Sequence, residues 1–222
     1  MSTEPQLRAI ADIVRVAGAG LWLRGGWAMD FYLGRVTRPH RDIDFLCRAT
    51  DAGRIVAALR GLGYRDLPGN APAGLQHDLE TPAGVDVQVT LLGEDADRCP
   101  TVPAGPYAGT RWPADLLSGP PGRIGEVSCA IVSPRAQIEI KEMMPVWVPG
   151  LRRREKDRRD VARLRAAMAE REITPGRATI AEHENTPGRT TTAKHENTPG
   201  RTTTAKHENT PGRGANPGTM GA

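Results

Sequence analysis

Residues 21–45 read LWLRGGWAMDFYLGRVTRPHRDIDF, and this stretch decides both the fold and the chemistry. The pair Gly25-Gly26 follows a short apolar run, and Asp42 and Asp44 stand one residue apart about a strand later. Side chains alternate along a β-strand, so both carboxylates point to one face while the residue between them points into the core. Two like charges this close are unfavourable unless a cation lies between them. Such an all-oxygen pair suits Mg²⁺, which binds one or two carboxylates together with substrate phosphates.

The Gly-Gly pair predicts a phosphate site next to these carboxylates. Glycine lets the backbone approach phosphate oxygens closely, and the N-terminus of a helix predicted over residues 27–33 would point at the same loop. Arg38 and His40 directly precede the Asp pair and are candidates either for contacting a triphosphate or for fixing the loop. For Arg38, an ion pair with Asp30 is the alternative.

The same stretch resembles the signature of small-molecule antibiotic nucleotidyltransferases, which belong to the polymerase-β-like superfamily. Most superfamily members carry serine next to the Gly pair, whereas the antibiotic-modifying subset shares the tryptophan found here. The resemblance is greatest to aminoglycoside 2''-adenylyltransferases, and lincosamide nucleotidyltransferases are similar. It is dense over residues 21–45 and weaker to about residue 165. The matching residues stand in one register: Gly25-Gly26-Trp27, Asp30, Gly34, Thr37-Arg38, His40 and Asp42-x-Asp44.

This resemblance implies transfer of AMP from Mg-ATP to a hydroxyl of a small-molecule antibiotic, above all an aminoglycoside. Gly25 and Gly26 would cradle the phosphates, and two Mg²⁺ ions would clamp the attacking and leaving oxygens. A third carboxylate is expected from a neighbouring strand. Asp86, which faces the polar side of a strand predicted over residues 85–92, is the candidate for metal ligand or general base, with Glu80 as the fallback.

Three alternatives remain open for the function. The strand sequence at residues 84–89 looks at least as much like that of a lincosamide nucleotidyltransferase. A toxin that modifies tRNA or protein is a second class, and a nucleotide-binding remnant without turnover is a third. The net charge of +4 is small, and no aromatic residues are interleaved with the basic run at residues 152–154, so we do not expect nucleic acid as a partner.

Two charged features follow the predicted catalytic segment. Lys141, on a helix predicted over residues 133–144 with Ser133 as its cap, is the candidate for a contact with the nucleotide phosphates. The run at residues 154–160, REKDRRD, resembles runs that pack on the catalytic domain in related enzymes. Its alternative interpretation is a solvated helix face.

We therefore expect an α+β protein with the polymerase-β-like nucleotidyltransferase fold: a small mixed sheet, flanking helices and a short helical C-terminal part. The predicted organisation is a catalytic domain over residues 1–132, a helical subdomain over 133–172 and a tail over 173–222. Thr-Pro-Gly-Arg recurs in the tail with a period of 12 residues. The repeats hold almost no large apolar residues, so stacking them would bury little, and we expect this tail to be disordered.

The bulk composition bounds the cellular context. Three cysteines without paired or zinc-like spacing argue against a disulfide framework. The first residues lack a basic start and an apolar signal core, and no apolar run reaches the ~20 residues that span a bilayer. We expect a cytoplasmic protein without a membrane partner, and its oligomeric state stays open.

Overall fold

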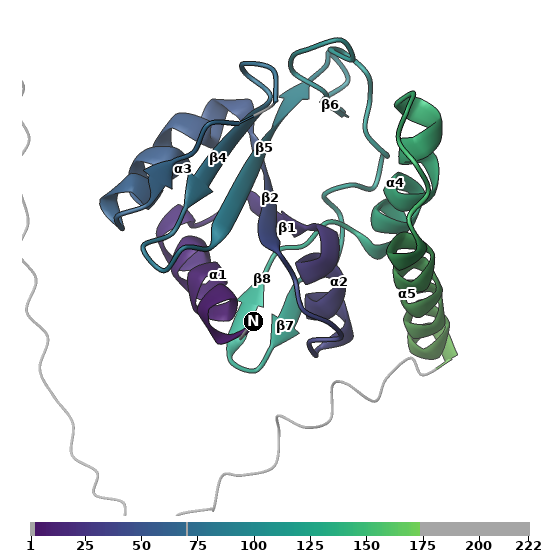
Figure 1. Cartoon of the computed structure of the whole chain (residues 1–222). Helices are drawn as coiled ribbons and strands as arrows, with labels where there is room; N and C mark the ends of the chain where they lie inside the picture. Colours follow the sequence, from purple (N-terminus) through teal and green to yellow (C-terminus); the bar gives the residue numbers. More distant parts are fainter. Residues whose placement is uncertain (1–2, 70, 174–222) are drawn as a thin grey trace, which may run out of the picture. The chain divides into compact units, whose positions relative to one another are not determined.

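The computed structural model describes residues 3–69 and 71–173 of the chain, and Figure 1 shows the arrangement of its elements. The helices are α1 (Glu4–Ala17), α2 (Gly25–Leu33), α3 (Ala49–Gly61), α4 (Pro134–Trp147) and α5 (Glu155–Ile173). The strands are β1 (Leu21–Arg24), β2 (Asp42–Arg48), β3 (Arg65–Asp66), β4 (Gln76–Glu80), β5 (Asp86–Glu94), β6 (Pro100–Thr101), β7 (Gly122–Ile124) and β8 (Val127–Cys129). No helix in the described part is long and apolar enough to cross a membrane.

One mixed sheet carries the fold, as the sequence predicts. Its strand order is β1-β2-β5-β4-β3, and β6 pairs with the far end of β5. Strands β2 and β5 run parallel, whereas β1 with β2 and β4 with β5 run antiparallel. The parallel pair needs a crossover, and α3 with the β3–β4 hairpin supplies it. The α+β expectation is therefore confirmed.

Side chains alternate along each strand, so the two faces of the sheet pack against different parts of the protein. Ile43 and Phe45 on β2, with Val87 and Val89 on β5, are fully buried in the main core beside α1 and α3. Leu46 belongs instead to a second, smaller core beneath α4, on the opposite face. Asp42 and Asp44 point to the same face as Leu46, because the three are spaced two residues apart on β2. All three line a cavity on this face.

The start of α2 differs from the prediction in a way that matters for the site. The helix begins at Gly25 rather than after the Gly pair, so both glycines lie in its first turn. Gly25 has φ +70°, a conformation in which a side chain is strained. The helix ends at Gly34, whose left-handed φ of +73° forms a regular C-cap.

The C-terminal half confirms some local predictions and changes others. Ser133 caps α4, because its Oγ accepts a hydrogen bond from the Ala136 amide, but the helix continues through Pro145 to Trp147. Before α4, the short strand β8 forms a hairpin with β7, and Ile131 makes a separate bridge to Leu23 of β1. That bridge places the start of α4 beside the end of β1.

Helices α4 and α5 pack on each other, and both contact α2. Leu164 of α5 is fully buried in the main core, so α5 is anchored to the part of the chain that carries the sheet. The proposed division at residue 132 stays a prediction. The predicted repeat tail lies outside the described residues from position 174 onward.

Candidate active site

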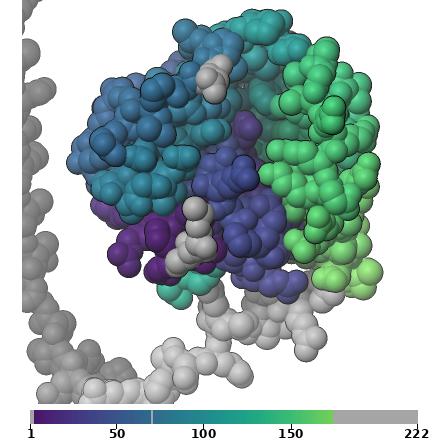
Figure 2. All heavy atoms as spheres, viewed as in Figure 1, coloured from purple at the N-terminus to yellow at the C-terminus, as the bar shows by residue number. Residues whose placement is uncertain are grey.

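A cavity of about 1050 Å³ opens on the polar face of the sheet. Figure 2 shows the corresponding hollow between the sheet region, in blue and teal, and the C-terminal helices, in green. One wall is formed by β1, β2 and β5 with the start of α2, and the other by α4 and the residues between α4 and α5. The wall residues that carry chemistry are Arg24, Gly25, Gly26, Arg38, His40, Asp42, Asp44, Gln88 and Lys141.

Asp42 and Asp44 both line this cavity from the start of β2, as the alternation of the strand predicts. Both are half-buried, and neither forms a hydrogen bond or ion pair within the described part of the chain. Burial raises the pKa of Asp44, and the charge of Asp42 adds to this, while the charges of Arg24, Lys141 and Lys156 oppose it. Two unpaired carboxylates facing a cavity form a donor set that fits Mg²⁺.

The two glycines let these groups converge on the start of α2. A Cβ atom added to Gly25 would lie 2.7 Å from Asp44 Oδ2, so the carboxylate rests directly against the glycine backbone. A Cβ atom on Gly26 would overlap the His40 ring and lie 2.7 Å from Arg38 Nη2. The pair therefore provides room for the neighbouring site residues, in addition to the phosphate cradle that its sequence predicts.

A chain of buried and partly buried hydrogen bonds holds the loop between α2 and β2. His40 Nε2 lies 2.7 Å from Asp30 Oδ2, and Arg38 Nη1 lies 3.0 Å from His40 Nδ1. Arginine only donates, so Nδ1 must accept and the imidazole proton sits on Nε2, where it is donated to the carboxylate. Asp30 also accepts from the Thr37 hydroxyl at 2.6 Å. With both ring nitrogens engaged, His40 is placed to fix the loop, and its contact with a triphosphate stays a prediction.

Arg38 does not pair with Asp30, the alternative left open by the sequence. Its Nη2 instead donates to Asp160 Oδ2 on α5, at 3.1 Å. Lys141 Nζ on α4 donates to the same oxygen at 3.0 Å and to Asp157 Oδ1 at 3.4 Å. Burial opposes ionisation of Asp160, but the hydrogen bonds and charges of Arg38 and Lys141 outweigh it and hold its pKa below the usual value.

The charged run before and within α5 is therefore divided between two environments. Asp157 and Asp160 are buried against the site, whereas Arg158 and Arg159 are exposed. The interpretation as a solvated helix face holds only for the second group. Lys141 lines the cavity, as its candidacy requires.

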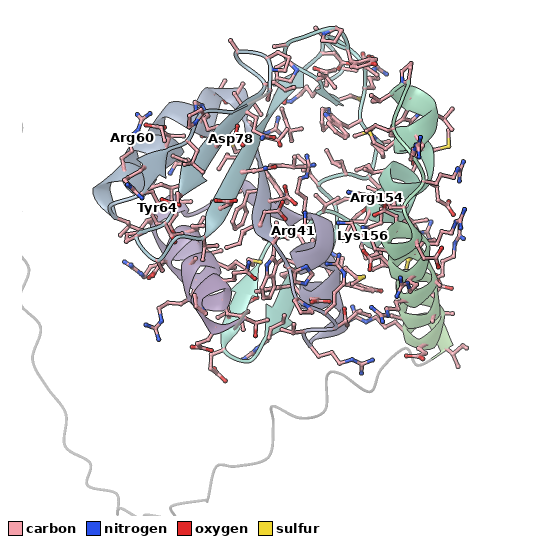
Figure 3. The ribbon with its side chains drawn as sticks, viewed as in Figure 1. Arg41, Arg60, Tyr64, Asp78, Arg154 and Lys156 are labelled. Carbon is pink, nitrogen blue, oxygen red and sulfur yellow. The ribbon has the colours of Figure 1, made fainter. Side chains whose placement is uncertain are left out.

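Cations line the cavity on both sides, and Arg152, Arg154 and Lys156 form a basic wall opposite the Asp pair. Figure 3 shows Arg154 and Lys156 on the helical side and Arg41 on the sheet side. All three line the cavity, together with Arg152. Partial desolvation lowers the pKa of Lys156, and the neighbouring charges of Arg154 and Arg38 add to this effect. Such a crowded basic wall suits a polyanion such as a triphosphate.

The predicted third carboxylate lies beside the pair but faces a different space. Asp86 of β5 is the register partner of Asp42, so both side chains stand on one face of the sheet. It is exposed and lines a smaller neighbouring cavity of about 270 Å³. The fallback, Glu80, forms an ion pair with Arg65. Over the described residues, no three His, Cys, Asp or Glu side chains are grouped closely enough to hold a metal ion.

Two residues of the site were not among its predicted members. Arg24 pairs in register with Asp44, and Gln88 of β5 occupies the position beside Asp44 on the other side. Strand alternation could have placed Gln88 on the polar face, because it is two residues from Asp86. Asp160 belongs to the run at residues 154–160 that the resemblance expects to pack on the catalytic domain, but its contacts with Arg38 and Lys141 were not predicted.

Comparison with solved structures identifies the fold as that of nucleotidyltransferases. The structure of the lincosamide antibiotic adenylyltransferase LnuA, lincomycin-bound, has a TM-score of 0.57 and 23% identity, and the match covers 74% of this chain and 98% of that one. The structure of ANT(2")-Ia in complex with adenylyl-2"-tobramycin also has a TM-score of 0.57, with 22% identity over 76% of this chain and 92% of that one.

Sequence comparison gives the family. The family model of the aminoglycoside-2''-adenylyltransferases matches residues 6–164, and the chain belongs to this family. A lincosamide resistance protein of Staphylococcus haemolyticus is 28% identical over 103 residues, which are 46% of this chain and 64% of the relative. A 2''-aminoglycoside nucleotidyltransferase of Escherichia coli is 49% identical over 45 residues, which are 20% of this chain and 25% of the relative. The chain thus matches less than two thirds of the length of either relative.

Proposed function

We propose that this protein transfers AMP from Mg-ATP to a hydroxyl group of a small-molecule antibiotic, above all an aminoglycoside. The observation that carries the proposal is the pairing of two unpartnered carboxylates, Asp42 and Asp44, with a basic wall across one cavity. A nucleoside triphosphate has the complementary chemistry, because its phosphates bind cations on both sides. The family membership and the nucleotidyltransferase fold support the same reaction class.

Positioning and charge neutralisation provide most of the catalysis in phosphoryl-type transfer. Asp42 and Asp44 would hold Mg²⁺, which neutralises charge on the phosphates when bound. Lys141 and the basic wall would bind the triphosphate, and Gly25 and Gly26 would leave room for its close approach. Asp86 is the register partner of Asp42 but lines the neighbouring cavity, so it would serve as general base only for an acceptor hydroxyl that reaches across both cavities.

Transfer of a nucleotide to a lincosamide is the second candidate function. It is favoured by the lincosamide resistance protein of Staphylococcus haemolyticus, which matches this chain over 103 residues. The fold does not separate the two acceptors, since function resides in the site. Both are therefore tested in one assay: purified protein, Mg²⁺ and ATP are incubated with a panel of aminoglycosides and lincosamides. Mass spectrometry detects AMP addition, and pyrophosphate release is measured in parallel.

Asp42→Asn should reduce AMP transfer by at least about 10²-fold, because it removes half of the carboxylate pair. Asp66→Asn is the matched control, since Asp66 is an exposed aspartate on β3 whose partner is Arg60. An adduct that persists in Asp42→Asn would contradict the proposed site. Folded wild-type protein that binds Mg-ATP but modifies no member of the panel would favour tRNA or protein as acceptor, or a remnant without turnover.

A further inference from the structure

The end of β1 places an arginine inside the proposed catalytic centre. Arg24 is the last residue of β1 and the register partner of Asp44 on the adjacent antiparallel strand. Directly paired residues of such strands have Cβ atoms about 5 Å apart and stand on the same face. Arg24 also lines the cavity, so its charge belongs to the same space as the Asp pair.

The guanidinium is held across the sheet. Arg24 Nη1 donates to Thr90 Oγ1 of β5 at 3.3 Å, and that hydroxyl donates to Gln76 Oε1 of β4 at 3.0 Å. To reach β5, the side chain passes over β2, which lies between the two strands in the sheet. The guanidinium thus lies over the strand that carries the carboxylates.

The remaining neighbours of Asp44 make this charge important. On the β5 side the position in register with Asp44 is Gln88, a neutral amide, and Gln88 lines the cavity. Asp86, the expected third carboxylate, lines the neighbouring cavity instead. Three aspartates line the main cavity, but Asp157 is paired with Lys141 and Arg154. The unpaired carboxylates are therefore Asp42 and Asp44, and Arg24 is the largest of the positive charges that act on Asp44. Two divalent cations would have to share two carboxylates with a fixed positive charge beside them.

We propose that Arg24 takes the place of one of the two metal ions, so that this protein works with the single divalent cation that binds together with the nucleotide. The proposal rests on the proposed function, because it assumes that Asp42 and Asp44 hold a nucleotide-bound metal. In this proposal Arg24 supplies the positive charge beside Asp44 that a second metal ion would otherwise supply. Unlike a metal ion, it does so without being coordinated by the carboxylate.

The test counts bound metal directly and does not depend on turnover. Full-length protein is saturated with α,β-methylene-ATP, which cannot release pyrophosphate, and titrated with Mn²⁺ while electron paramagnetic resonance measures the free ion. We expect one bound Mn²⁺ per bound nucleotide in the wild type and in Arg24→Lys, which keeps the charge. In Arg24→Gln, which removes it, we expect a second Mn²⁺ to bind.

Arg60→Gln is the matched control, because Arg60 is exposed on α3 and pairs with Asp66 away from the cavity. This control should bind one Mn²⁺ per nucleotide. Two Mn²⁺ per nucleotide in the wild type, or one in a folded Arg24→Gln protein, would overturn the inference while leaving the proposed function intact. Absence of Mn²⁺-nucleotide binding in the folded wild type would overturn both. If Arg24→Gln does not fold, Arg24→Lys still tests the inference. Two Mn²⁺ per nucleotide in Arg24→Lys would contradict the role of the charge.

Discussion

Replacing Asp160 by asparagine tests how α5 holds the proposed phosphate-binding residues. Asp160 Oδ2 accepts hydrogen bonds from both Arg38 and Lys141, and the side chain is 1% exposed. Asparagine has the same shape but no charge, so the variant leaves two cations facing a neutral group. In the described part of the chain, Asp160 is the only hydrogen-bond and ion-pair partner of Arg38 on the C-terminal helices, and the same change removes its charge.

The size of the effect follows from the burial of the partners. Removal of one member of a buried ion pair costs about 3–5 kcal/mol. The Arg38 and Lys141 side chains are 25% and 12% exposed, so water partly replaces the lost charge and the lower limit applies. We expect the free energy of unfolding to fall by about 3 kcal/mol. In a chain of this size that corresponds to a decrease in Tm of roughly 6–12 °C.

The pH dependence of this effect has a definite sign. Arg38 and Lys141 hold the pKa of Asp160 below its usual value in the folded protein. A carboxyl with a depressed folded pKa stabilises the protein fully above its unfolded pKa of about 3.9, and this stabilisation is lost as the pH falls through the folded pKa. The stability difference between wild type and Asp160→Asn should therefore be constant near neutral pH and shrink below about pH 4.

Urea unfolding at several pH values measures this difference, and KM for ATP reports the positioning of Lys141. The control is Glu142→Gln, because Glu142 and Arg165 join the same two helices through an exposed pair. That variant should lose no more than about 0.5 kcal/mol. Equal stability of Asp160→Asn and Glu142→Gln at pH 7, or a difference that grows on acidification, would refute the reasoning.

Two further predictions concern the glycine pair and the cysteines. Gly26→Ala places a methyl group against the His40 ring, so we expect a loss of about 2 kcal/mol in urea unfolding, and unchanged stability would show that the ring has room to move. Burial raises the pKa of Cys47 to about 11 and that of Cys129 to about 12. At pH 8 a thiol-reactive disulfide should therefore modify only Cys99 in the folded protein and all three cysteines in denaturant, and three fast native thiols would contradict the buried placement.

Local sequence was sufficient for the features that depend on chain geometry over a few residues. Alternation along a strand placed Asp42 and Asp44 on one face, and both line the same cavity. The Ser-Pro pair at the start of α4 predicted its cap, and Ser133 accepts the expected hydrogen bond. The glycine pair was recognised as a point of close approach, although only the packing showed that His40 and Asp44 occupy the space.

The tertiary structure decided which distant charges meet. Arg38 and Asp160 are 122 positions apart, and their contact depends on how α5 packs against α2, for which no local pattern exists. The placement of Asp86 in a neighbouring cavity likewise depends on the walls that α4 and the segment before β4 build around the sheet. Sequence alone determined the residues that face one way along a strand, because backbone alternation is local. The partners of those residues were decided by packing, because ion pairs and cavities arise between elements that only the folded chain brings together.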